Sequence, residues 1–137
     1  MGIDERKLVE LAKKAREYAY APYSHFKVGA ALLTKSEKVY TGCNVENASF
    51  GAANCAERTA FFKAVSEGEH SFSAIAIVGA ADGTDTVGTC APCGICRQVM
   101  REFCKPDFEV IMTDGQDVKA VAFSELLPMA FGPDDLK

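Results

Sequence analysis

A chain of 137 residues, 48% of them hydrophobic and 25% charged, is long enough to bury a core, and we expect one domain over residues 1–137. The formal net charge of -4 argues against a sequence-independent grip on nucleic-acid phosphates, which requires clustered lysine and arginine. No apolar run is long enough to cross a bilayer, and the charged N-terminus lacks the apolar core of a signal peptide. We therefore expect a cytoplasmic protein that binds neither nucleic acid nor membrane.

Apolar periodicity, strand-forming residues and turn residues predict nine elements in the order αββαβαββα. In chain order they are a helix over residues 4–21, strands over 26–34 and 38–45, a helix over 55–66, a strand over 74–78 followed by a loop over 79–88, a helix over 92–103, strands over 109–113 and 119–123, and a short last helix. Asp4 and Ser124 are the expected N-caps of the first and last helices, and Pro92 suits the first turn of the third. Leu126 and Leu127 are expected to face inward from the last helix.

The order of these elements predicts the fold class. A hairpin followed by alternating helices and strands implies a mixed sheet with helices on both faces. We therefore predict a three-layer α/β/α sandwich around a mixed five-stranded sheet. In this fold Cys55 and the Cys93-x-x-Cys96 pair begin successive helices, where the positive end of the helix dipole favours thiolate over thiol.

Three of the six cysteines have the spacing of a metal site. In a chain without a secretion signal, reduced thiols that serve metal or redox chemistry are a better interpretation than a disulfide framework. Cys93 and Cys96 can hold one ion from a single turn, and Cys55 can supply a third sulfur. A structural zinc site closes its tetrahedron with four protein ligands, whereas a hydrolytic site keeps three. Three thiolates and the unattached carboxylate of Glu57 therefore predict a catalytic zinc site with one open position.

The two charged residues that follow Cys55 fit this chemistry. Glu57 can take a proton from a metal-activated water without being a ligand, which is general acid–base catalysis. Arg58 can donate a hydrogen bond to sulfur and offset the negative charge of three thiolates around Zn²⁺. The alternative is that the cysteines are small buried residues or a redox pair, with Glu57 and Arg58 as solvated helix charges. The combination of both motifs favours zinc.

Several separated segments carry a resemblance to a known family. Cys55-Ala56-Glu57-Arg58, the segment from Pro92 to Gln98, Asn44-Val45-Glu46-Asn47, and the segments over 21–32 and 126–131 resemble the cytidine deaminases of the small homotetrameric type. The resemblance covers nearly the whole chain. It implies one Zn²⁺ per subunit and hydrolytic deamination of cytidine and deoxycytidine to uridine and deoxyuridine, with ammonia released, in pyrimidine salvage.

The resemblance also implies roles for substrate-binding residues. Asn44 and Glu46 are expected to hydrogen-bond the ribose hydroxyls of the nucleoside. Phe26 is expected to pack against the pyrimidine, and the backbone of Ala56 to meet the base. Phe131 is expected to reach a neighbouring subunit's site, so that the active sites of a homotetramer are completed across subunits. Each residue alone also has an ordinary structural interpretation, and only their joint match favours substrate binding.

The remaining polar residues near the motifs are assigned as supporting or structural. Gln98 and Arg97 match the family's segment after the second metal pair, where either can support the sulfurs. Five residues outside the ligand motif are expected to be structural: Cys43, Cys90, Cys104, His25 and His70.

Two other functions stay open at this point. One is a zinc deaminase for another substrate, such as a nucleoside antibiotic or a nucleic-acid base, although a polynucleotide enzyme needs a basic groove that this acidic chain lacks. The other is a non-catalytic binding module in which zinc only joins two helices. Glu57 separates the two classes, because a structural module has no use for an uncoordinated carboxylate beside its metal.

Overall fold

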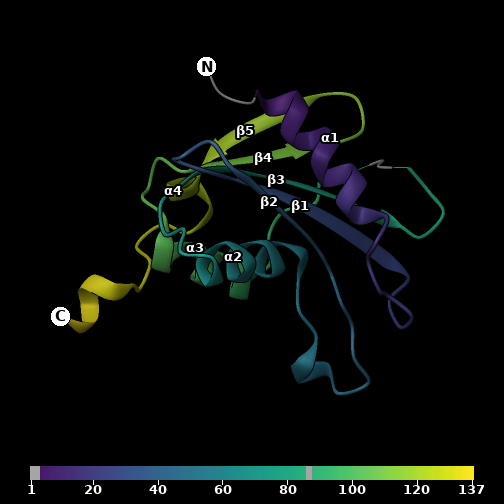
Figure 1. Ribbon diagram of the computed structural model, residues 1–137, viewed down its shortest axis with the longest axis horizontal. Coiled ribbons are helices and arrows are strands. Elements are labelled where there is room, and N and C mark those ends of the chain that lie inside the picture. The colour runs from purple at the N-terminus through teal and green to yellow at the C-terminus, as the bar shows by residue number, and fades with distance from the viewer. Residues whose placement is uncertain (1–3, 86–87) are drawn as a thin grey trace.

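A computed structural model describes residues 4–85 and 88–137, and it confirms the predicted three-layer α/β/α sandwich (Figure 1). One helix covers one face of a five-stranded sheet and the other helices cover the opposite face. The helices are α1 (Glu5–Arg16), α2 (Ala56–Ser66), α3 (Gly94–Phe103) and α4 (Phe123–Leu126), with short 3-10 helices η1 (Phe50–Ala52) and η2 (Pro133–Leu136). The strands are β1 (Phe26–Thr34), β2 (Val39–Cys43), β3 (Phe72–Ala81), β4 (Glu109–Thr113) and β5 (Val118–Ala122).

The sheet is mixed, with the strand order β2-β1-β3-β4-β5. β1 pairs antiparallel with both β2 and β3, and β4 pairs antiparallel with β5. β3 and β4 are parallel, with Ile75 opposite Val110. A parallel pair needs a crossover connection, and α3 lies within the segment that makes it. β2 ends directly before Asn44, and β3 ends before the segment that carries Cys93 and Cys96.

The helix α1 packs alone on one face of the sheet. Asp4 caps it as expected, because its side chain accepts a hydrogen bond of 2.8 Å from the backbone N–H of Lys7. Leu8, Val9 and Ala12 on its buried side meet alternate residues of β1, β3 and β4. Because successive side chains of a strand point to opposite faces, the strand residues between those that meet α1 lie on the other face of the sheet.

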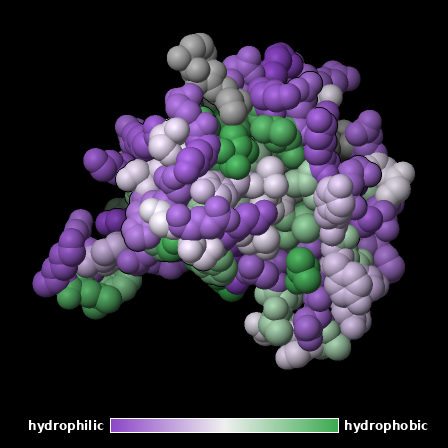
Figure 2. All heavy atoms as spheres, in the orientation of Figure 1, coloured by the Kyte–Doolittle hydropathy of each residue, from purple (hydrophilic) through white to green (hydrophobic). Residues whose placement is uncertain are grey.

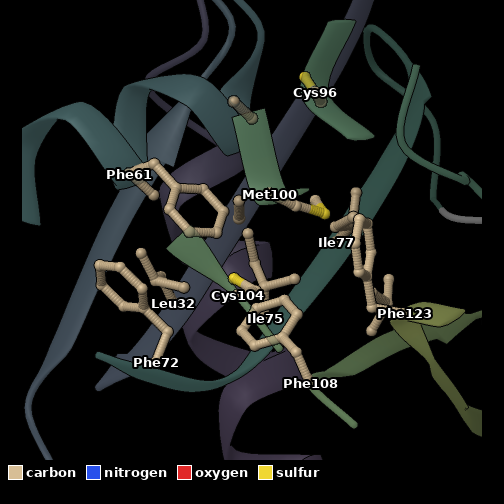
Figure 3. Packing of buried hydrophobic residues seen from close by; sticks show 14 of the residues in the cluster. Leu32, Phe61, Phe72, Ile75, Ile77, Cys96, Met100, Cys104, Phe108 and Phe123 are labelled. Carbon is tan, nitrogen blue, oxygen red and sulfur yellow. The ribbon is translucent and has the colours of Figure 1, made fainter. Parts of the chain in front are cut away.

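The opposite face carries the larger core, beneath α2, α3 and α4. It is rich in aromatic residues, with Phe61 and Met100 fully buried. Figure 3 shows Met100 reaching from α3 into the space between Phe61 and Ile77, with Cys96 one turn earlier on the same helix. Burying side chains of this size stabilises the fold by about 1.5–3 kcal/mol each. The core therefore fixes the helices whose first turns carry the predicted metal ligands.

Two glycines let helices approach the sheet more closely than any other residue would allow. A β-carbon on Gly29 would lie 2.0 Å from the backbone oxygen of Ala12 in α1. A β-carbon on Gly42 would lie 2.5 Å from the backbone oxygen of Ala56 in α2. The two glycines are in adjacent strands, one against each helical layer. The distance between β2 and the start of α2 thus depends on the missing side chain of Gly42.

Several predicted boundaries differ from the structure, and the first helix ends at Arg16 instead of reaching residue 21. The predicted loop over 79–88 begins as strand, because Gly79 to Ala81 pair with the start of β1; residues 86 and 87 of that loop lie outside the described residues. β2 ends at Cys43 instead of 45. Pro92 precedes α3 instead of lying in its first turn, because Cys93 has the extended backbone of an N-cap. Ser124 is inside α4 and does not cap it, since the helix starts at Phe123 directly after β5.

Candidate metal centre and active site

The three predicted ligand cysteines come together at the starts of two helices. Cys55 is the N-cap of α2, Cys93 is the N-cap of α3, and Cys96 lies in the first turn of α3. The Cys93 sulfur is 3.7 Å from the Cys55 sulfur and 3.5 Å from the Cys96 sulfur, and all three sulfurs lie within 4.8 Å of one another. Among residues 4–85 and 88–137, no other group of three or more His, Cys, Asp or Glu side chains is arranged to hold a metal ion.

The spacing of these sulfurs fits zinc. Thiolate sulfurs bind zinc at about 2.3 Å, so three of them at tetrahedral angles lie about 3.8 Å apart. The two separations from the Cys93 sulfur, 3.7 and 3.5 Å, are close to that value. Soft thiolate donors select zinc over magnesium or calcium, which prefer oxygen. Cys90, the other cysteine before α3, is not part of the group.

Arg58 contributes a positive charge to the sulfurs. Its Nη2 donates a hydrogen bond of 3.1 Å to the sulfur of Cys55. Hydrogen bonds from the Cys96 thiol and from Arg58 lower the pKa of Cys55 to about 5, whereas the same pairing with Cys55 raises the pKa of Cys96. The two thiols therefore titrate as a pair, in which the first proton is lost more readily than from an isolated thiol. The Arg58 Nε atom is buried without a hydrogen-bond partner among the described residues.

Glu57 is buried beside the sulfurs, with only 5% of its surface exposed. It lies in the first turn of α2, and the Cys96 thiol is within hydrogen-bonding reach of its carboxylate. Burial raises the pKa of Glu57 to about 7, because a charged carboxylate loses its hydration there. A carboxyl group with a pKa near neutrality can both accept and release a proton, as a general acid–base catalyst must.

Asn44 and Glu46 lie just beyond the end of β2. The Asn44 amide spans the β1 backbone, accepting from the Val28 N–H at 2.8 Å and donating to the Phe26 oxygen at 2.9 Å. Glu46 accepts hydrogen bonds from the backbone N–H groups of Tyr23 and Ser24 and from the Ser24 hydroxyl. These hydrogen bonds lower the pKa of Glu46, and the bond from the Ser24 hydroxyl has the largest effect. Both side chains are therefore fixed in place; Asn44 keeps one amide hydrogen and one oxygen lone pair free, and the Glu46 carboxylate can accept one further hydrogen bond.

A cavity of about 370 Å³ opens beside Glu46. Its lining consists of Tyr23, Ser24, Glu46, Asn47, Phe50 and Ala53. The rings of Tyr23 and Phe50 meet edge to face, with centroids 6.2 Å apart. Apolar walls with one carboxylate suit a small, mostly uncharged ligand that offers hydroxyl groups.

The other predicted substrate residues are distributed around the same end of the sheet. Phe26 is 42% exposed at the start of β1, and its ring and the Cys90 sulfur both pack over Gly79, 3.0 and 2.8 Å from where a β-carbon would lie. Ala56 is fully buried between Cys55 and Glu57. Phe131 is 58% exposed on the C-terminal segment.

The family comparison shows which kind of protein has this arrangement. Residues 3–112 match the family described as the cytidine and deoxycytidylate deaminase zinc-binding region. The chain belongs to this deaminase family. Membership of a zinc-binding family and the sulfur geometry together identify Cys55, Cys93 and Cys96 as the site of one Zn²⁺.

Similar proteins cover almost the whole deaminase chain. A protein of Sporosarcina psychrophila named cytidine deaminase is 50% identical over 135 residues, which are 98% of this chain and 96% of the relative. The crystal structure of cytidine deaminase from Burkholderia pseudomallei is similar with a TM-score of 0.85 and 55% identity, covering 94% of this chain and 100% of that chain. Cytidine deaminase from Mycobacterium tuberculosis has a TM-score of 0.79 and 35% identity, covering 96% and 99%. These likenesses confirm the predicted fold. Among the described residues, none of this deaminase's helices has the length and apolar character needed to span a membrane.

One predicted supporting residue of the deaminase site does not contact the sulfurs. Gln98 is exposed, and its Nε2 donates a hydrogen bond of 2.9 Å to the backbone oxygen of Phe131. Arg97 donates to the backbone oxygens of Pro92 and Leu126 at 2.8 and 2.7 Å. Both side chains therefore fasten chain segments, whereas Arg58 makes the contact to sulfur.

Sequence reasoning missed the residues that position those it named. Ser24 holds Glu46, and the Thr59 hydroxyl donates a hydrogen bond of 3.0 Å to the backbone oxygen of Cys55. Thr59 is four residues after Cys55, which is the spacing for such a bond on a helix. Ser24 has no comparable local signal, because its partner is 22 residues away in the sequence.

Proposed function

We propose that this protein catalyses the hydrolytic deamination of cytidine and deoxycytidine to uridine and deoxyuridine. The observation that carries the proposal is the buried carboxyl of Glu57, which lies beside three thiols that already supply a full set of protein ligands. The 50% identity to a protein named cytidine deaminase supports the choice of substrate.

The reaction requires water to add at C4 of the pyrimidine and the bond from C4 to the amino nitrogen to break, so that ammonia leaves. Zinc held by Cys55, Cys93 and Cys96 supplies a Lewis acid that makes water nucleophilic at neutral pH. Glu57 takes the proton of the attacking water, delivers it to N3 and then carries a proton to the departing amine. Burial of Glu57 favours its protonated form, which the second transfer requires.

Glu46 and Asn44 select a nucleoside over a nucleotide. The carboxylate of Glu46 accepts hydrogen bonds from neutral ribose hydroxyls and repels a phosphate. Hydrogen bonds to Ser24 and Tyr23 fix that carboxylate and keep it ionised. Asn44, fixed on the backbone of β1, has one amide hydrogen and one oxygen lone pair left for the sugar.

The active protein is a homotetramer in this proposal, and Phe131 of one subunit reaches the site of another. The exposure of large hydrophobic side chains in the C-terminal segment supports it: Met129, Phe131 and Leu136 are all exposed. Sedimentation velocity at micromolar concentration tests the assembly, and a monomer would contradict it. We further propose a cytoplasmic location and a role in pyrimidine salvage, in which free nucleosides are the substrate.

The deciding experiment is the loss of cytosine ultraviolet absorbance when the zinc-loaded protein meets cytidine. Wild type is compared with Glu57→Gln at equal zinc content, and Glu102→Gln, an exposed site on α3, is the matched control. We expect turnover by wild type and Glu102→Gln, and a loss of at least about 100-fold in Glu57→Gln. No turnover by fully loaded wild type would overturn the cytidine assignment. Equal activity in Glu57→Gln would overturn the role of the carboxyl and leave a site that binds zinc only.

A further inference from the structure

The C-terminal segment, residues 128–137, has a backbone conformation that local preferences alone do not favour. It leaves α4 and stands off the body of the molecule in Figure 2. Met129 is fully exposed and has φ of 53°, a left-handed conformation that costs an ordinary residue about 1–2 kcal/mol. Because the Met129 side chain is exposed, its own burial does not offset that cost. Contacts made by other residues must therefore hold the segment in this conformation.

Those contacts come from three side chains of α3. The Arg97 Nη1 donates to the Leu126 oxygen at 2.7 Å, just before the segment begins. The Gln98 Nε2 donates to the Phe131 oxygen at 2.9 Å. The guanidinium carbon of Arg101 lies 2.4 Å from where a β-carbon on Gly132 would be, so it packs flat on that glycine. The segment is therefore held at Phe131 and Gly132, and the residue Leu126 before it is held as well, by the helix that carries Cys96.

We propose that Gln98 is a positioning residue that holds Phe131 in place on α3, with Arg101 as its partner at the next point. This inference rests on the proposed function in one respect, namely that Phe131 serves an active site. Because Gln98 is two residues after Cys96, one short helix sets both the sulfurs and the aromatic side chain. The position of the zinc ligands in one subunit and the position of the Phe131 side chain that it offers to a neighbouring subunit therefore both depend on α3.

The chemistry of the contact explains why glutamine is present. A carbonyl oxygen needs a donor, which an amide provides and a carboxylate does not. Gln98→Glu has nearly the same shape, but it places a negative charge against the Phe131 oxygen. It is therefore expected to release the segment as fully as Gln98→Ala does.

The chain contains no tryptophan, so Phe131→Trp supplies a single fluorescent reporter at the position in question. In this background, Gln98→Ala and Gln98→Glu are compared with Gln116→Ala, which removes the chain's other glutamine from the exposed turn after β4. We expect the two Gln98 variants to show a red-shifted emission maximum, lower anisotropy and stronger acrylamide quenching. Zinc content is expected to stay the same, and Gln116→Ala is expected to match its parent.

The same Gln98 substitutions in the otherwise wild-type chain test the consequence for catalysis. Loss of one hydrogen bond is expected to lower kcat/KM for cytidine by about fivefold at full zinc occupancy. Unchanged tryptophan emission and quenching in both Gln98 variants would overturn the proposal. The fluorescence readout needs no deamination, so a wild-type protein without turnover would refute the proposed function while the positioning test still stands.

Discussion

Replacing Gly42 with alanine is expected to damage catalysis more than stability. The added β-carbon would lie 2.5 Å from the Ala56 oxygen and 2.6 Å from the Ala60 nitrogen, where ordinary contact begins at 3.4 Å. Both atoms are helix backbone, so α2 must retreat from β2 by about 0.9 Å, the difference between those distances. Such overpacking lowers the free energy of unfolding by about 1–3 kcal/mol. Alanine also reduces the conformational entropy of the unfolded chain, which offsets about 0.4–1 kcal/mol of that loss.

The expected loss of activity in Gly42→Ala arises because α2 carries residues of the active site. A retreat of this size moves Glu57 and Cys55 relative to Asn44, which follows Gly42 by two residues at the end of β2. A misplacement of about 1 Å in an active site can cost about 100-fold in rate. We therefore expect kcat/KM for cytidine to fall by about 10- to 100-fold in Gly42→Ala, with weaker zinc binding. The assays are cytosine absorbance, chelator competition for zinc, and thermal unfolding.

Gly29→Ala is the matched control, because it drives a β-carbon into the backbone of α1 on the face remote from the sulfurs. If that variant does not fold, Leu8→Ala destabilises the same face by about 2–5 kcal/mol. These controls should unfold at lower temperature yet keep the kcat/KM and zinc affinity of wild type. The reasoning is refuted if Gly42→Ala loses no more activity than a control of equal stability.

Two further predictions concern the charged residues beside the sulfurs. Arg58→Ala removes the 3.1 Å hydrogen bond to the Cys55 sulfur and a positive charge, so zinc affinity measured by chelator competition should fall by about 10- to 100-fold. In zinc-free protein, the carboxyl of Glu57 binds its proton more tightly in the folded state, with its pKa raised from 4.5 to about 7. Its contribution to stability is full below pH 4.5 and is lost as pH rises through 7, by roughly 3 kcal/mol in urea unfolding. Glu57→Gln should remove this slope.

Each of these predictions has a clear contrary result. Zinc affinity in Arg58→Ala equal to that of wild type would make Arg58 a packing residue only. Parallel stability curves for zinc-free wild type and Glu57→Gln between pH 4.5 and 8 would show that burial does not raise the pKa of Glu57.

Local patterns were enough to predict the centres of the helices and strands and the metal ligands. Cys93 and Cys96 are one helical turn apart, so their shared direction follows from helix geometry alone. Asp4 was recognisable because its partner is only three residues away. The fold class followed from the order of elements, since a hairpin and a crossover leave few ways to cover both faces of a sheet.

The errors lie where a distant partner decides the outcome. β3 continues to Ala81 because the long strand β1 supplies pairing partners to its end. Gln98 was expected near the sulfurs, yet it bonds to Phe131, 33 residues further along the chain. The role of Gly42 could not be predicted from the sequence, because the need for a residue without a side chain arises only from the helix that packs against it. Each case requires knowledge of tertiary contacts that periodicity does not contain.

The sulfur cluster also bears on the folding of the chain. Cys55 and Cys93 are 38 residues apart in sequence, so an ion held by both acts as a cross-link that closes a loop of that length. An ion that binds the folded chain and not the unfolded chain adds its binding free energy to the free energy of unfolding. The segment enclosed by the cross-link contains all of α2 and β3, the central strand of the sheet. Removal of the ion is therefore expected to lower the free energy of unfolding together with the capacity for turnover.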